Sequence, residues 1–354
     1  MLEGWTECLE PDGFFFSDRN PGLMHYYYDK HVAALVDIYL YCHEPKALEY
    51  LSRITDCAEK ELSRVKLYAS PTGFDGGEWY TLAENLYRAY LATGDTRYCD
   101  FAKVWEYRDY WNCFESDPGK VLFEVLAEKH GWYHAYSHVN TFSSLAAAYL
   151  TEGNPADLAL LEKACDYVRA TQCYSTGGYG PNENLLQHPT LMQLLAETHR
   201  HFETQCGSWA GFKLSRYLMA FTGEARFGDW IELLLINGIG ASIPMSGDGR
   251  VFYYSDYNPG GAAKHNIDAP WACCTGTRPQ AVAEYANLIY FHTEKALFVN
   301  LYAESTLHWE RPGGAVEVAQ KTVFPESEET VLTLALDTPA EFAKIGRASC
   351  RERV

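Results

Sequence analysis

The sequence has no long apolar segment. No run approaches the ~18 consecutive apolar residues that a membrane-spanning helix needs, and the stretch from Met1 to Trp5 does not resemble a signal peptide. Basic residues are also scarce, because 29 lysines and arginines face 47 aspartates and glutamates and leave a net charge of −18. Such an acidic surface disfavours nucleic acid and anionic membranes as partners, whereas it is compatible with a neutral sugar.

Familiar cysteine signatures are missing as well. The chain has 11 cysteines but no Cys-x-x-Cys motif. A disulfide scaffold is disfavoured because the chain is long and most of its cysteines lie inside apolar helical patterns, at positions 8, 42, 57, 99, 113, 165 and 173. We therefore expect reduced thiols and a cytoplasmic location.

Two short motifs nevertheless group cysteines in an informative way. Cys273 and Cys274 are adjacent, and Glu203 and Cys206 lie three residues apart at the start of a helical pattern, so that the latter two would point the same way. Three thiolates and one carboxylate form a ligand set that suits a closed tetrahedral Zn²⁺ site. The alternative interpretation is that these cysteines are small apolar core residues.

A glycine-punctuated repeat organises the helical part. The segments 91–98, 150–157 and 221–227 each place glycine after an aromatic-rich helical run and restart a helix within a few residues. Copies about 50 to 70 residues apart are typical of helical hairpins stacked into an array or a ring, and predict a mainly α fold, an α/α toroid. We expect helices at 28–43, 46–66, 81–93, 96–113, 137–151, 155–173, 208–222, 225–239 and near 277–291. A six-hairpin ring needs twelve helices, so we expect the toroid to be truncated before Met1.

After Ile289 the pattern changes to a period of two. The segments 296–302, 315–319 and 330–336 alternate or are rich in β-branched residues, which predicts the first strands of a β-sandwich. The last residues, 345–354, can be back-translated into a common sequencing-adapter read, so we interpret the tail as an artefact. The predicted organisation is a helical catalytic domain at 1–290, a truncated sandwich at 291–343 and an artefactual tail at 344–354.

Several motifs together resemble glycoside hydrolase family 127. They are Thr176 to Gly180 (TGGYG), His201 to Lys213 (HFETQCGSWAGFK), Thr222 to Glu232 (TGEARFGDWIE), Asn237 to Ala241 (NGIGA), Asp248 to Tyr254 (DGRVFYY) and the Cys273-Cys274 pair. They follow the order that the family has and cover roughly residues 20 to 340. Characterised members are β-L-arabinofuranosidases, which are retaining enzymes with a zinc-bound cysteine nucleophile on an (α/α)6 barrel.

The resemblance implies roles for individual residues. Cys273 would be the nucleophile, with Glu203, Cys206, Cys273 and Cys274 as the Zn²⁺ ligands, although the best-known members separate the glutamate and the first cysteine by one residue instead of two. Glu183, which follows the TGGYG element, would be the acid/base, with Glu197 in reserve. His31 and His138 would contact the sugar, with Tyr254 and Trp79 as further candidates; the histidine that the family has near Trp79 is absent.

The resemblance thus implies a retaining glycoside hydrolase that releases β-L-arabinofuranosyl or similar furanosyl units from plant glycans. Two alternatives remain open. A toroidal glycosidase or unsaturated-uronide hydrolase could use an ordinary carboxylate pair, and a carbohydrate-binding protein could use zinc only as a structural ion.

Overall fold

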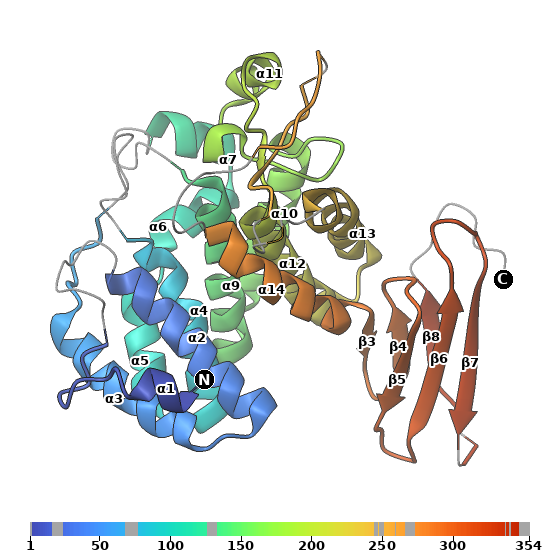
Figure 1. Ribbon diagram of the computed structural model, residues 1–354, viewed down its shortest axis with the longest axis horizontal. Coiled ribbons are helices and arrows are strands. Elements are labelled where there is room, and N and C mark those ends of the chain that lie inside the picture. The colour runs from blue at the N-terminus through green and yellow to red at the C-terminus, as the bar shows by residue number, and fades with distance from the viewer. Residues whose placement is uncertain are drawn as a thin grey trace. The chain divides into compact units, whose positions relative to one another are not determined.

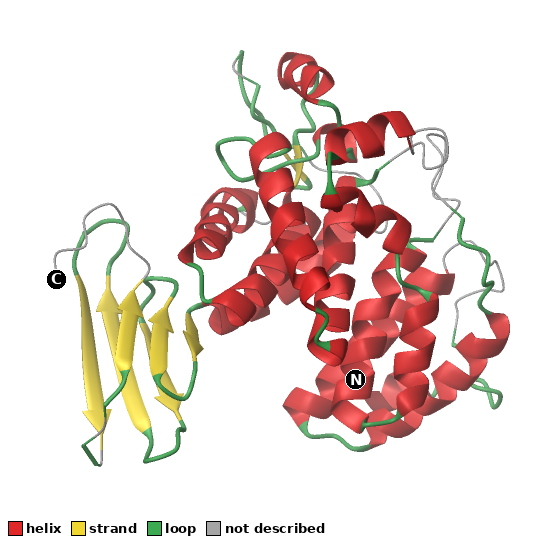
Figure 2. Ribbon diagram, turned by 180° about the vertical axis from the view of Figure 1, so that it is seen from behind, coloured by secondary structure: helices red, strands yellow, loops and turns green. Residues whose placement is uncertain are grey.

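The computed structural model describes residues 2–15, 24–67, 77–125, 133–243, 247, 251–258, 260–265, 273–336, 338–339 and 341–346. Helices dominate up to Leu288, and strands dominate from Tyr290 on (Figures 1 and 2). The fold is therefore mainly helical, as the sequence predicts. None of the described helices is both long enough and apolar enough to cross a membrane.

The chain divides into two compact units that interleave in sequence. Unit 1 comprises Met1–Cys173, Tyr179–Phe202 and Tyr257–Ala262, and unit 2 comprises Tyr174–Gly178, Glu203–Asp256 and Ala263–Val354. The sequence predicts different boundaries, with a helical domain at 1–290, a sandwich at 291–343 and a tail at 344–354. This division stays a prediction. Residues 347–354 of the predicted tail lie outside the described part of the chain.

Unit 1 is built from helices that pack against one another in pairs. Helix α2 packs against α3 and α4, α4 packs against α5 and α9, and α9 packs against α10. The bounds are α1 Leu2–Thr6, α2 Met24–Cys42, α3 Lys46–Glu61, η2 Trp79–Thr81, α4 Leu82–Thr93, α5 Thr96–Val104, α6 Arg108–Trp111, η3 Asn112–Glu115, α7 Pro118–Lys120, η4 Val121–Val125, α9 Ala135–Glu152, α10 Pro155–Thr171, η5 Pro181–Glu183 and α11 His188–Glu197.

The predicted glycine stops are confirmed. Gly94, Gly153 and Gly223 end α4, α9 and α12 with φ of 74°, 69° and 69°, in the left-handed region that glycine adopts without a Cβ penalty. The next helices begin at once, because Asp95 and Asn154 each accept a hydrogen bond from the backbone two residues on. Each glycine thus ends one helix, and the polar residue after it begins the next, at similar positions in successive hairpins.

The single helix predicted at 96–113 is wrong. Helix α5 ends at Val104, and α6 and η3 follow only from Arg108 on. Trp105 and Tyr107 are both buried. Residues two apart point to different sides of an α-helix, so the burial of both rings in one core requires the break. The prediction also missed α11, which begins with proline in its first turn.

Among its described residues, unit 2 contains three packed helices followed by two small sheets. Helix α12 (Thr204–Thr222) packs against α13 (Ala225–Leu234) and α14 (Cys273–Glu284). The remaining short elements are β1 Phe202–Glu203, η6 Leu235–Ile239, η7 Gly240–Ser242, β2 Tyr254–Ser255 and η8 Tyr285–Leu288. Strand β1 crosses the boundary between the units, and β1 and β2 form a two-stranded sheet.

The sheets have the orders β3-β4-β8 and β5-β6-β7. Their strands are β3 Tyr290–His292, β4 Ala296–Val299, β5 Ser305–Trp309, β6 Val316–Thr322, β7 Thr330–Leu336 and β8 Ala343–Gly346. All pairings are antiparallel except β4 with β8. Leu297 of the first sheet joins Trp309, Val316 and Val318 of the second in one apolar core, so the two sheets pack face to face.

Candidate functional site

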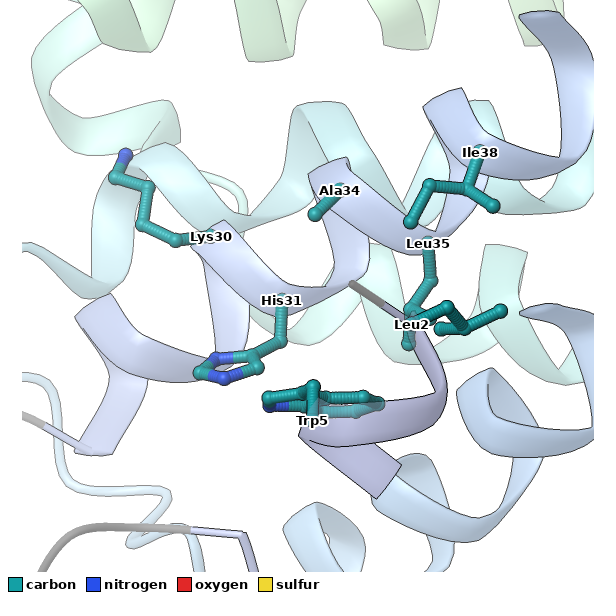
Figure 3. A pocket seen from close by; sticks show the side chains of 7 residues that line it. All are labelled: Leu2, Trp5, Lys30, His31, Ala34, Leu35 and Ile38. Atoms are coloured by element: carbon teal, nitrogen blue, oxygen red, sulfur yellow. The ribbon is translucent and has the colours of Figure 1, made fainter. Parts of the chain in front are cut away.

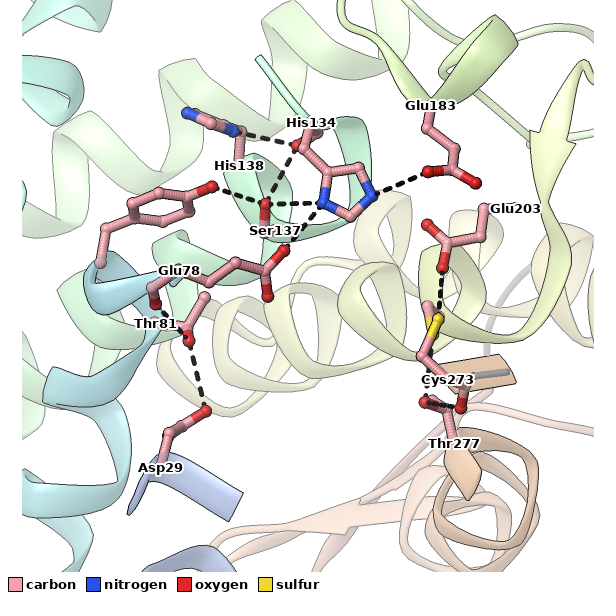
Figure 4. Close-up of polar contacts among 12 residues, drawn as sticks. Asp29, Glu78, Thr81, His134, Ser137, His138, Glu183, Glu203, Cys273 and Thr277 are labelled. Carbon is pink, nitrogen blue, oxygen red and sulfur yellow. Dashed lines mark hydrogen bonds and ion pairs between the residues drawn. The ribbon is translucent and has the colours of Figure 1, made fainter. Parts of the chain in front are cut away.

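The predicted thiol and carboxylate ligands converge within unit 2. Figure 4 shows the contact between Glu203 and Cys273. Glu203 is the extended residue that precedes α12, and Cys206 lies in the first turn of that helix. Cys273 and Cys274 begin α14, which packs along α12. One ligand atom from each of the four residues lies within 4.8 Å of all the others. The cluster therefore forms where the first turns of α12 and α14 meet, although these segments lie about 70 residues apart in the sequence.

The spacing of these atoms fits a tetrahedral metal shell. Cys206 Sγ and Cys274 Sγ are 3.6 Å apart, and Glu203 Oε1 lies 3.2 Å from Cys273 Sγ and 3.6 Å from Cys274 Sγ. Four ligands around Zn²⁺, with Zn–S bonds of about 2.3 Å, would have sulfur–sulfur edges of about 3.8 Å. The four residues could thus hold a metal ion with little rearrangement.

Cys273 differs electrostatically from the other two thiols. Hydrogen bonds from the Cys206 and Cys274 thiols hold the pKa of Cys273 far below its usual value. Burial raises the pKa of Cys206 and of Cys274 well above the usual range. Cys273 is also the only partly exposed member of the three, since Cys206 and Cys274 are buried. Cys273 therefore combines a lowered pKa with partial exposure, whereas the other two thiols are buried.

Tyr253 completes the cluster and was missed from the sequence. Its hydroxyl donates to Glu203 Oε1 over 3.2 Å and lies 3.3 Å from Cys273 Sγ. The sequence candidate was the next residue, Tyr254, which is buried with its ring 4.6 Å from that of Tyr253. Neighbouring side chains of an extended segment point to opposite faces, so the motif alone could not choose between them.

Glu183 lies in a second polar cluster, which belongs to unit 1. It ends η5, where both Asn182 and Glu183 have left-handed backbones with φ of 51° and 60°. Its Oε2 faces His134 Nε2 over 3.5 Å, and His134 Nδ1 is 2.8 Å from Glu78 Oε1. Glu78 and His134 are buried, and neither was a sequence candidate. They are 56 residues apart, so no local pattern indicates their pairing.

The candidate sugar contacts His138 and Trp79 lie in the interior of unit 1. The His138 ring is packed 4.7 Å from Tyr80 and 5.0 Å from Tyr110, and its Nδ1 is 3.0 Å from His134 O. Trp79 is buried and donates from Nε1 to Leu67 O. Their roles as sugar contacts stay predictions.

His31 and Glu197 lie in other parts of unit 1. His31 contacts Trp5 and Phe15 at ring distances of 5.3 and 5.0 Å, and burial lowers its pKa. It lines a largely apolar hollow of about 290 Å³ (Figure 3). Glu197 is exposed at the end of α11 and accepts a hydrogen bond from Gln193 of the same helix. The contact role of His31 and the reserve acid/base role of Glu197 stay predictions.

Comparisons with solved structures identify proteins that share this fold. A GH127 β-L-arabinofuranosidase from Geobacillus stearothermophilus T6 superposes with a TM-score of 0.70 at 18% identity, over 95% of this chain and 59% of that chain. A second structure, described as a GH127 β-arabinofuranosidase, superposes with a TM-score of 0.70 at 18% identity, over 94% of this chain and 55% of that chain. This chain therefore spans less than two thirds of the length of either. A comparison with curated proteins gave no significant match.

The expected (α/α)6 architecture is confirmed by these superpositions. The sequence model described as "Beta-L-arabinofuranosidase, GH127 catalytic domain" matches residues 3–287. That range covers most of the chain and contains both polar clusters. The chain therefore belongs to glycoside hydrolase family 127.

Proposed function

We propose that this protein is a retaining glycoside hydrolase that releases β-L-arabinofuranosyl or similar furanosyl units from plant glycans, with Cys273 as nucleophile and Zn²⁺ as cofactor. The observation that carries the proposal is the convergence of Glu203, Cys206, Cys273 and Cys274. A carboxylate pair would serve an ordinary retaining glycosidase, and three clustered thiols would have no part in it. Family membership and the names of the solved relatives supply the furanosyl substrate class.

The roles of the residues follow from the chemistry of retention. Cys273 Sγ attacks the anomeric carbon and forms a C–S bond as the glycosidic C–O bond breaks, while Glu183 gives its proton to the departing oxygen. Water then attacks the same carbon and gives a proton to Glu183, the C–S bond breaks, and the thiolate of Cys273 is released. Two inversions at one carbon give net retention.

Glu203, Cys206, Cys273 and Cys274 would hold the metal. Bound Zn²⁺ keeps coordinating thiols deprotonated near neutral pH and fixes their orientation. The Tyr253 hydroxyl donates to Glu203 and lies 3.3 Å from the sulfur of Cys273, so it contacts two of these ligands. Cys206 and Cys274, which are buried, act as anchors, whereas the partly exposed Cys273 is placed to react.

Metal content and covalent trapping test the proposal together. We expect one Zn²⁺ per purified chain, and a mass increase of one pentosyl unit on Cys273 when an aryl β-L-arabinofuranoside is quenched in acid. Cys273→Ser should lose nearly all turnover because a hydroxyl is far less nucleophilic. Cys274→Ser should act mainly through weaker metal binding, so excess Zn²⁺ should restore part of its activity.

Cys57→Ser provides the matched control, because Cys57 is buried on α3 in unit 1. It should keep both its zinc and its turnover. Zinc-free enzyme with full activity would support a carboxylate-pair glycosidase instead. Zinc without any labelling or hydrolysis would support a binding protein with a structural ion.

A further inference from the structure

A buried histidine links two glutamates in unit 1, and only one of them has a role so far. His134 precedes α9; its Nδ1 is 2.8 Å from Glu78 Oε1, and its Nε2 faces Glu183 Oε2 over 3.5 Å (Figure 4). The exposed fraction of the side chain is 3% for Glu78, 5% for His134 and 18% for Glu183. Access to solvent therefore increases along the line toward Glu183.

Backbone contacts and backbone conformation fix Glu78 and Glu183, the two glutamates on either side of His134. His134 and Asn184 form an antiparallel bridge, and Leu185 N donates to Tyr133 O over 3.0 Å. The loop of Glu183 is thus paired directly to the chain that carries His134. Glu78 and Glu183 both have left-handed backbones, with φ of 50° and 60°. Such conformations are uncommon for residues with a Cβ and persist where the surroundings fix them, often at functional sites.

Glu78 also decides which nitrogen of the imidazole faces Glu183. A carboxylate can accept hydrogen bonds but cannot donate them. The 2.8 Å contact between Glu78 Oε1 and His134 Nδ1 therefore holds the proton of the ring at Nδ1. The Ser137 hydroxyl, which is 3.1 Å from the same nitrogen and 2.9 Å from the Tyr80 hydroxyl, supports this orientation. Nε2 is thereby directed at Glu183.

We propose that His134, oriented by Glu78, is the positioning residue of Glu183. The inference rests on the proposed function, in which Glu183 first gives up a proton and later takes one back. Imidazole suits both states: with its one proton on Nδ1, the neutral ring accepts at Nε2 from a protonated carboxyl, and when the ring takes up a second proton from solvent, Nε2–H of the imidazolium donates to a carboxylate. Glu183 therefore keeps its place while its charge changes twice in one cycle. A residue that can only donate, such as lysine, could hold just one of these states.

The leaving-group dependence of the rate tests this role, since it reports on proton donation and not on folding. His134→Ala should lower kcat/KM on alkyl furanosides, whose poor leaving groups need the proton, by roughly 10²-fold, within the usual range for general acid catalysis. An aryl furanoside with an acidic phenol should lose less than about threefold, because its oxygen departs without help. Glu78→Gln, which leaves the volume unchanged, should show the same pattern more weakly.

A double-mutant cycle separates this role from a general effect on the structure. In a Glu183→Gln background, His134→Ala should cause no further loss on alkyl furanosides, because it acts through the group already removed. His25→Gln is the matched control, since His25 is also buried and is 3.0 Å from a backbone oxygen, that of Ser63. It should leave both substrate types unchanged.

The outcomes distinguish the two levels of the proposal. Equal losses on both substrate types, or additive losses in the Glu183→Gln background, would overturn the positioning role alone. A Glu183→Gln enzyme without any leaving-group dependence would overturn the acid role of Glu183 and, with it, the positioning role. Should His134→Ala fail to fold, Glu78→Gln carries the same comparison.

Discussion

Gly180 holds the loop of Glu183 against α9, and its replacement by alanine allows a quantitative test. The glycine has φ of 76°, and a Cβ added there would lie 2.2 Å from Ala135 Cβ. Two costs therefore combine: the left-handed backbone of a residue with a Cβ costs roughly 1–2 kcal/mol, and overpacking typically costs a further ~1–3 kcal/mol. We expect Gly180→Ala to lower the free energy of unfolding by about 2–5 kcal/mol.

Gly153→Ala isolates the backbone cost. Gly153 has φ of 69°, and nothing lies within 4 Å of an added Cβ. Its replacement should cost only about 1–2 kcal/mol. The double variant Gly180→Ala/Ala135→Gly removes the colliding methyl group, so it should recover the overpacking part, less the roughly 0.5–1 kcal/mol that glycine costs in a helix.

Urea denaturation of the four proteins measures these differences, with kcat/KM on alkyl and aryl furanosides as a second readout. Because Glu183 is three residues from Gly180, the clash should also displace the acid, and the alkyl substrates should lose more than the aryl ones. The double variant should regain this activity. If Gly180→Ala were as stable as Gly153→Ala, or if Ala135→Gly did not rescue it, the close approach of the loop to α9 would be refuted.

Two further predictions concern the metal cluster and the pH dependence of stability. Tyr253→Phe should weaken Zn²⁺ binding roughly 10-fold to 100-fold in competition with a chelator, because it removes the hydroxyl that donates to Glu203 and contacts Cys273. The control Tyr28→Phe removes a buried hydroxyl bonded to Thr55 and should leave the Zn²⁺ affinity unchanged. Equal Zn²⁺ affinities in the two variants would contradict the role of Tyr253. Burial lowers the pKa of His25 below 6.5. Below pH 6.5 the unfolded chain therefore binds a proton at His25 that the folded chain does not bind. The free energy of unfolding then falls as pH decreases, by at most about 1.4 kcal/mol per pH unit. His25→Gln should flatten the decline between pH 6.5 and 5 in urea titrations; an unchanged slope would show that His25 does not titrate in this window.

The sequence predicted features that depend on nearby residues or on a family motif. Gly94, Gly153 and Gly223 indicate helix ends because a left-handed residue is a local property. The vicinal cysteines and Glu203 could be combined because their residue types together suggest one metal. The strand predicted at 330–336 has the same bounds as β7, since alternation with β-branched residues is also local.

Features decided by long-range packing could not be predicted. The break after Val104 depends on a core that takes up both Trp105 and Tyr107. The pairing of Glu78 with His134 joins α9 to the residue before η2, and neither residue belongs to a recognisable motif. The parallel pairing of β8 with β4 likewise depends on chain segments more than 40 residues apart.

The thiol cluster has a consequence for handling the protein. Cys206 Sγ and Cys274 Sγ are 3.6 Å apart, and a disulfide bond of about 2.05 Å would need only a modest movement of the two side chains. A bound metal occupies these sulfurs and protects them from oxidation. Chelator-treated protein exposed to air should therefore trap itself in an oxidised form that no longer takes up metal until a reductant is added. Loss of activity on storage would then be a chemical event at two anchor residues, with the helical fold intact.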